Sequence, residues 1–90
     1  MIKNYVRFCD EIGETRKTIM NVIDNIADLE QQNVAMIATN KAFDEMRNNI
    51  LRQNTKGLID HIEMNCLLDY LKETYGDIVH EFAKNLMYIK

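Results

Sequence analysis

The chain has 90 residues, a net charge of −3 at pH 7, no proline and only three glycines. Hydrophobic residues make up 47% of it and charged residues 28%, a composition typical of a folded, helix-rich chain rather than a disordered one. The acidic balance disfavours a nucleic-acid partner, because phosphate binding depends on an excess of Lys and Arg. At this length one domain is expected, near the size at which a small core benefits from self-association.

Apolar residues recur at alternating steps of three and four from Tyr5 to Ile50, the pattern of a coiled-coil-like helix. The opposite column of the heptad is almost entirely polar, so one face should contact water. A straight helix over this range would be about 70 Å long, whereas a compact domain of this size has a radius of gyration of about 12 Å. We therefore expect either a short break, near Gly13 in preference to Thr39–Asn40, or a long arm that packs against other copies.

The predicted fold is all-α: an antiparallel helical hairpin or bundle with one long coiled-coil-like helix, which we expect oligomerisation to complete. The predicted elements are a helical segment over about 3–12, a long helix over about 14–53, a turn over 53–57 and a helix over about 57–89. The polar stretch 52–57 marks the turn, with Asn54 or Thr55 placed to cap the next helix. Gly76 is expected to kink or end that last helix.

The centre of the long helix is the predicted self-association surface. Residues 34–38 are apolar on every side of a helix, and one partner helix cannot cover such a segment. Asn33 and Asn40 occupy successive a positions of the heptad, where a buried Asn fixes register and oligomer state; alternatively, they lie where the helix leaves the core. We expect a homodimer or higher oligomer that uses Val22, Ile26, Leu29, Asn33, Val34, Met36, Ile37, Asn40 and Phe43.

A second candidate surface lies on the C-terminal helix and is acidic. Residues 60–81 carry a net charge of −5, and a few large apolar residues lie among charged columns off the apolar stripe. Such residues are typical of a protein-binding face, although scattered surface hydrophobes are also common. The predicted partner-binding residues are Leu67, Asp69, Tyr70, Glu73, Asp77, Glu81 and Tyr88.

No pattern in the sequence predicts catalysis, cofactor binding or metal coordination. Cys9 and Cys66 form no CxxC motif, and His61 and His80 are too far apart in sequence for a helical ligand pair. We expect two buried thiols in a reducing, cytoplasmic compartment, no cofactor, and no membrane-spanning segment.

The sequence thus predicts a non-enzymatic protein–protein interaction module that self-associates and binds a protein partner. One alternative is a small inhibitor or immunity-type protein, as found in phages and mobile elements, whose acidic helical surface blocks a host enzyme. A second alternative is a small-ligand-binding or enzymatic bundle. That class requires a polar pocket among Arg16, Asn33, Asn40 and Arg47.

Overall fold

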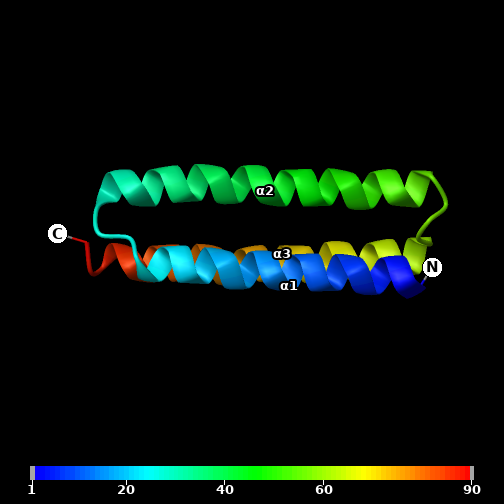
Figure 1. The fold of residues 1–90 in the computed structure, drawn as a ribbon, viewed down its shortest axis with the longest axis horizontal. Helices are drawn as coiled ribbons and strands as arrows, with labels where there is room; N and C mark the ends of the chain where they lie inside the picture. The colour runs from blue at the N-terminus through cyan, green and yellow to red at the C-terminus, as the bar shows by residue number, and fades with distance from the viewer. Residues whose placement is uncertain (1, 90) are drawn as a thin grey trace.

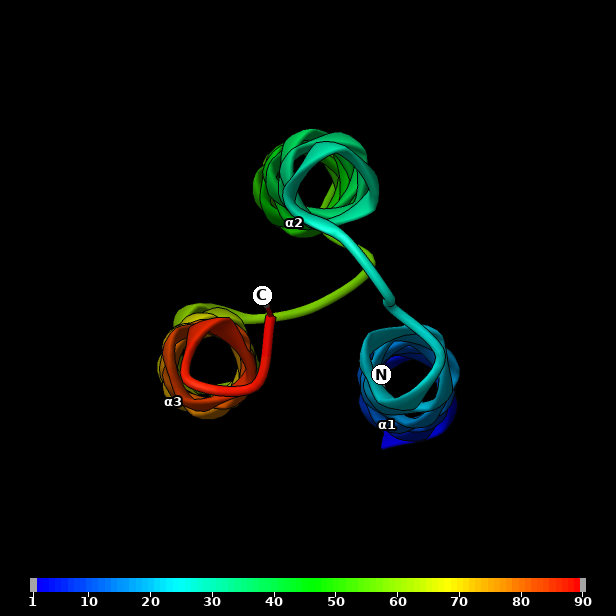
Figure 2. The same cartoon turned by 90° about the vertical axis from the view of Figure 1, so that its left-hand side faces the viewer.

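The computed structural model describes residues 2–89. Within this range the chain forms three helices, α1 (Ile2–Asp24), α2 (Leu29–Thr55) and α3 (His61–Leu86). α2 runs antiparallel to α1 and α3 (Figure 1), and end-on the helices stand at the corners of a triangle (Figure 2). The result is a rod with Cα extents of 49 × 16 × 15 Å and a radius of gyration of 14.7 Å. The prediction of an all-α bundle is confirmed.

The prediction of one long helix over 14–53 is wrong, because the chain folds back between Asp24 and Leu29. The side chain of Asp28 caps α2 by accepting a hydrogen bond from the backbone N–H of Gln31 at 2.8 Å. The side-chain oxygen of Gln31 in turn accepts the backbone N–H of Ala27 at 2.8 Å. Both expected break points, Gly13 and Thr39–Asn40, lie inside helices. Folding back lets the apolar faces of α1 and α2 pack within one chain.

α2 ends in a Schellman motif built around Gly57. The backbone N–H of Gly57 donates to the carbonyl of Asn54, and that of Leu58 donates to the carbonyl of Gln53, both at 3.0 Å. Gly57 has a φ of +77°, which is costly for any residue that carries a Cβ. These bonds satisfy the last carbonyls of α2 and turn the chain toward α3.

α3 begins with a capping box rather than with the predicted caps. Asp60 accepts the backbone N–H of Glu63 at 2.7 Å, and the Glu63 carboxylate accepts the backbone N–H of Asp60 at 3.0 Å. Asn54 instead donates to the carbonyl of Ile59 at 3.1 Å, inside the turn. The predicted turn at 53–57 is therefore displaced toward 56–60. The helix continues through Gly76 to Leu86, so it does not end at Gly76, which was one of the two outcomes expected from the sequence.

The core runs along the axis of the bundle. The face of α2 that is buried in it differs from the predicted seam. In α2 the buried positions include Gln32, Thr39 and Met46, whereas the predicted seam positions Asn33, Asn40 and Arg47 are exposed. The fold-back interrupts the helical phase, so α2 takes the rotation that its own packing favours. The buried hydrophobic residues are Phe8, Ile12, Ile23, Phe43, Met46, Ile50, Ile59, Leu67, Leu71, Ile78 and Phe82.

One fully buried polar side chain, Gln32, joins the start of α2 to the end of α3. It is 1% exposed. Its Nε2 donates to the carbonyl of Phe82 at 3.1 Å, and its Oε1 accepts from Nδ2 of Asn85 at 2.8 Å. A buried amide is stable only when its donors and acceptors are satisfied. This pair of hydrogen bonds therefore favours one rotation of α2 over the others.

Candidate functional site

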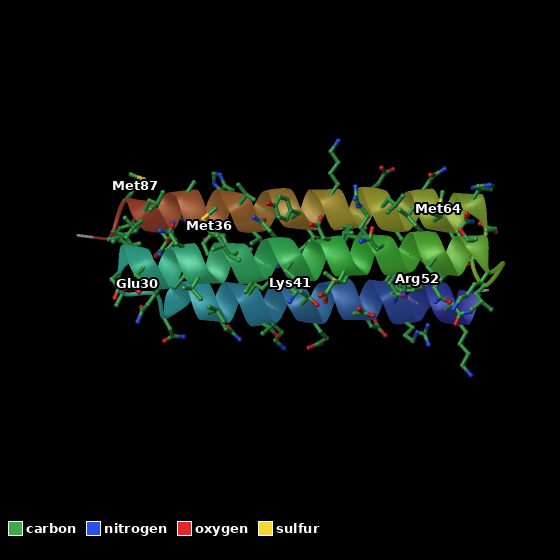
Figure 3. The ribbon with its side chains drawn as sticks, turned by 90° about the horizontal axis from the view of Figure 1, so that it is seen from above. Glu30, Met36, Lys41, Arg52, Met64 and Met87 are labelled. Atoms are coloured by element: carbon green, nitrogen blue, oxygen red, sulfur yellow. The ribbon has the colours of Figure 1, made fainter. Side chains whose placement is uncertain are left out.

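The predicted self-association residues separate into core and surface. Phe43 is buried, and Ile26 and Met36 are half-buried and pack against the core of the same chain. Met36 lies between α2 and α3 in Figure 3. Phe43 therefore holds the chain's own helices together and is not free for a second copy, whereas Ile26 and Met36 contribute to the core and keep part of their surface exposed. The exposed members of the predicted set are Val22, Leu29, Asn33, Val34, Ile37 and Asn40.

Asn33 and Asn40 are not buried within the chain, so neither fixes the register of its core. Both are exposed, and Oδ1 of Asn40 accepts a hydrogen bond from the hydroxyl of Tyr75 on α3. The Tyr75 ring packs edge-on against Phe43 with ring centroids 5.3 Å apart. Asn40 therefore supports the α2–α3 contact, and a role for either Asn in pairing with a second copy stays a prediction.

Four exposed side chains form a line along the outer face of α2, away from α1 and α3. Glu30, Val34, Ile37 and Lys41 follow one another at spacings of four, three and four residues, which places them on one side of a helix. Val34 is 63% exposed and Ile37 is 69% exposed. Figure 3 looks onto this face and labels its charged ends, Glu30 and Lys41. We call these four residues the α2 outer stripe.

An open groove between α1 and α2 lies beside the outer stripe, because α1 packs more extensively against α3 than against α2. Two adjoining hollows in it have volumes of about 450 and 610 Å³. The residues common to their walls are Thr18, Val22, Ala35 and Ala38. Val22 is 46% exposed, and the alanines add little bulk. Val34 lines the groove and also belongs to the outer stripe. The apolar surface is therefore continuous from the groove onto the outer face of α2.

Sequence reasoning located this region through residues 34–38 but missed two of its residues. The predicted surface did not include Glu30 or Lys41, because the outward direction was assigned from a helix whose rotation differs in the structure. The spacing of Glu30 and Lys41 around Val34 and Ile37 was the available signal. Residues 34–38 are not covered on every side, since Ala35 and Met36 face the core while Val34, Ile37 and Ala38 remain exposed.

A separate hollow, of about 620 Å³, lies between α2 and α3 and is more polar. Its lining includes Asn40, Asp44, Arg47, Asp69 and Lys72, so both signs of charge are present. The polar pocket expected for a ligand-binding bundle is thus only partly formed. Asn40 and Arg47 share this hollow, whereas Arg16 lies between α1 and α3, 3.9 Å from the carboxylate of Asp77. Asn33 does not line the hollow.

The predicted partner-binding residues of α3 are also divided. Leu67 is 0% exposed and belongs to the core, so its assignment to a surface was wrong. The reason is that α3 packs against both other helices, and its buried arc is wider than a single stripe. Asp77 pairs with Arg16 and Glu81 is half-buried. The remaining exposed members are Asp69, Tyr70, Glu73 and Tyr88.

The two thiols are free and lie near Tyr5 at the N-terminal end of the bundle. Cys9 is half-buried and Cys66 is exposed, so the expectation of two buried thiols is wrong. A side-chain hydrogen bond with Cys9 raises the pKa of the Tyr5 hydroxyl above its ordinary value of 10.0, with smaller contributions from the charge of Cys9, burial, Cys66 and Glu63. The arrangement places a phenol beside two thiols.

Over residues 2–89, no group of three or more His, Cys, Asp or Glu side chains is placed to hold a metal ion. None of the helices in this range combines the length and apolarity required to cross a membrane. No family model matches the chain, and no curated protein or solved structure shows significant similarity to it. The exposed apolar surface of α2 and its neighbouring groove are the features of residues 2–89 that bear on function.

Proposed function

We propose that this protein is a non-enzymatic helical interaction module that self-associates through the outer face of α2. One observation carries the proposal: Val34 and Ile37 are 63% and 69% exposed on consecutive turns, and their apolar surface continues through Ala38 to Val22. Single exposed hydrophobes are ordinary, but a continuous apolar patch is typical of an interface. Free thiols at Cys9 and Cys66 support a reducing, cytoplasmic setting.

The size of the patch indicates a weak dimer. Complete burial of a Val or Ile side chain contributes roughly 1.5–3 kcal/mol. Because Val34 and Ile37 are each about two-thirds exposed, covering them contributes roughly 1–2 kcal/mol per residue. A few such side chains per copy, within a polar rim, fall in the range of small interfaces that form transient complexes. Because association itself costs several kcal/mol, we expect a weak dimer whose population depends on protein concentration.

Sedimentation velocity over a concentration series tests the proposal directly. The mass should rise from 10.6 kDa toward twice that value as the concentration increases. Val34→Lys and Ile37→Lys should each keep the protein monomeric without lowering its helical content, because both positions are exposed. Ile62→Lys is the matched control, since Ile62 is 75% exposed on α3 and lies outside the surface. A wild-type chain that stays monomeric throughout would contradict the proposal.

A second candidate function is the inhibitor class, favoured by the exposed carboxylates of Asp69 and Glu73 on α3. They lie four residues apart, one turn of helix, beside Tyr70, which is partly exposed. The positive charge of Lys72, which lies between them in sequence, reduces the net negative charge of this face. The test is capture of host proteins by wild-type chain and by the Asp69→Lys, Glu73→Lys double variant. Equal recovery of the same proteins by both would exclude the acidic face as the binding determinant.

A further inference from the structure

The order of side chains along the α2 outer stripe is complementary to itself when reversed. Read from its N-terminal end the stripe is acidic, apolar, apolar and basic: Glu30, Val34, Ile37, Lys41. Read from the other end it is basic, apolar, apolar and acidic. An antiparallel copy therefore places a cation against each anion and an aliphatic side chain against each aliphatic one. Surfaces related by a two-fold axis must be self-complementary in this way.

We propose that the occupant of the α2 outer face is α2 of a second copy, running antiparallel about a two-fold axis midway between Val34 and Ile37. In this register Glu30 of each copy faces Lys41 of the other, and Val34 of each faces Ile37 of the other. The inference rests on the proposed self-association and adds its orientation and register. Two Glu–Lys pairs and four aliphatic side chains then lie on one seam, the arrangement typical of antiparallel helix pairs.

A parallel pair of α2 helices does not have this property. It would place Glu30 of one copy against Glu30 of the other, and Lys41 against Lys41. Like charges on facing side chains repel each other. A parallel seam is therefore disfavoured at both of its ends. The neighbouring residue Ala38 is small and does not prevent close approach on the groove side, where helix axes pack about 8–10 Å apart.

The location of Glu30 and Lys41 on the chain supports the same pairing. Glu30 lies in the first turn of α2, two residues after the capping residue Asp28, and Lys41 lies near the middle of the helix. Neither side chain takes part in an ion pair within 4.0 Å in residues 2–89. Both charged groups are exposed and are therefore available to a second copy.

Charge reversal with restoration tests the register. Glu30→Lys and Lys41→Glu should each raise the dimer Kd on the order of tenfold, because the two-fold axis doubles each lost attraction and each new repulsion. The double variant that carries both reversals regenerates the pairs with opposite polarity. Its Kd should return to within about threefold of the wild-type value. Asp69→Lys and Lys72→Glu on α3 are controls that make the same changes in net charge away from the seam.

The outcomes separate this inference from the proposed function. If the wild type dimerises and Ile37→Lys abolishes the dimer, but the double variant is no tighter than the single ones, the antiparallel register is wrong and self-association stands. If the wild type is monomeric at every concentration, both are wrong. Thermal unfolding of each variant at a concentration where it is monomeric detects any cost of placing Lys in the first turn of α2, where the helix dipole disfavours cations. That cost is common to Glu30→Lys and the double variant, so it cannot produce the restoration.

Discussion

Replacing Gln32 by Leu is expected to destabilise the bundle, although it puts an apolar residue into an apolar core. Gln32 is 1% exposed and makes two hydrogen bonds to α3, to the carbonyl of Phe82 and from the amide of Asn85. Leu occupies a similar volume, so little cavity is created. The free energy of unfolding falls because the two hydrogen bonds are lost and the amide of Asn85 is left without a protein partner.

Each hydrogen bond contributes about 0.5–1.5 kcal/mol net, and an unsatisfied buried group costs about 1–3 kcal/mol. Asn85 is only half-buried and regains part of that cost from water. We therefore expect a loss of about 2 kcal/mol. For a chain of this size such a loss lowers Tm by roughly 8–16 °C. Replacing Gln32 and Asn85 together by Leu removes both partners and should recover at least half of the loss.

The assay is thermal and urea unfolding followed by circular dichroism, at a protein concentration where the chain is monomeric. Asn65→Leu is the control for Asn85→Leu, since Asn65 is exposed on the same helix. A Gln32→Leu variant as stable as the wild type would contradict this prediction. So would a double variant whose loss of unfolding free energy equals the sum of the losses in the two single variants. The Gln32 contact would then have no role in setting the rotation of α2.

Three further predictions concern stability and titration. Leu67→Ala should cost about 2–5 kcal/mol because the side chain is fully buried, whereas Ile62→Ala should stay within about 0.5 kcal/mol; urea unfolding compares them. Gly57→Ala should cost about 1–2 kcal/mol, since φ is +77° there; no loss in thermal unfolding would contradict this. Cys9→Ala should lower the pKa of Tyr5 toward 10.0 in a spectrophotometric titration. The folded protein holds the Tyr5 proton more tightly than the unfolded chain, and this stabilises the fold. The contribution is complete below about pH 10 and is lost as the pH rises through the raised pKa of Tyr5. An unchanged titration curve in the Cys9→Ala variant would exclude Cys9 as the cause of the raised pKa.

The all-α fold and the turn before α3 could be predicted because they depend on local chemistry. Apolar spacing of three and four residues marks a helix, and a polar stretch ending in glycine marks its end. The fold-back at 25–28 was missed because the apolar phase continues across it. Asp28 followed three residues later by Gln31 was the local signal of a new helix. Periodicity alone does not distinguish one long helix from two antiparallel helices joined by a short turn.

The candidate site was predicted only in part, because local sequence shows where apolar residues cluster but does not show how many neighbours a helix has. Residues 34–38 stood out by being apolar on every side, and the exposed side chains of Val34 and Ile37 lie there. Leu67 was misplaced because the width of the buried arc on α3 depends on how many neighbours the helix has. A sequence pattern cannot give that number.

Local sequence is enough to establish that the chain is helical, that a helix ends near Gly57 and that the middle of the chain carries more apolar surface than one helix contact can cover. These properties arise from residues within one or two turns of each other. Only the tertiary structure decided the rotation of α2. That rotation follows from contacts between residues about fifty positions apart, such as Gln32 with Phe82 and Asn85. It places Phe43 and Met46 in the core and leaves the α2 outer stripe facing water.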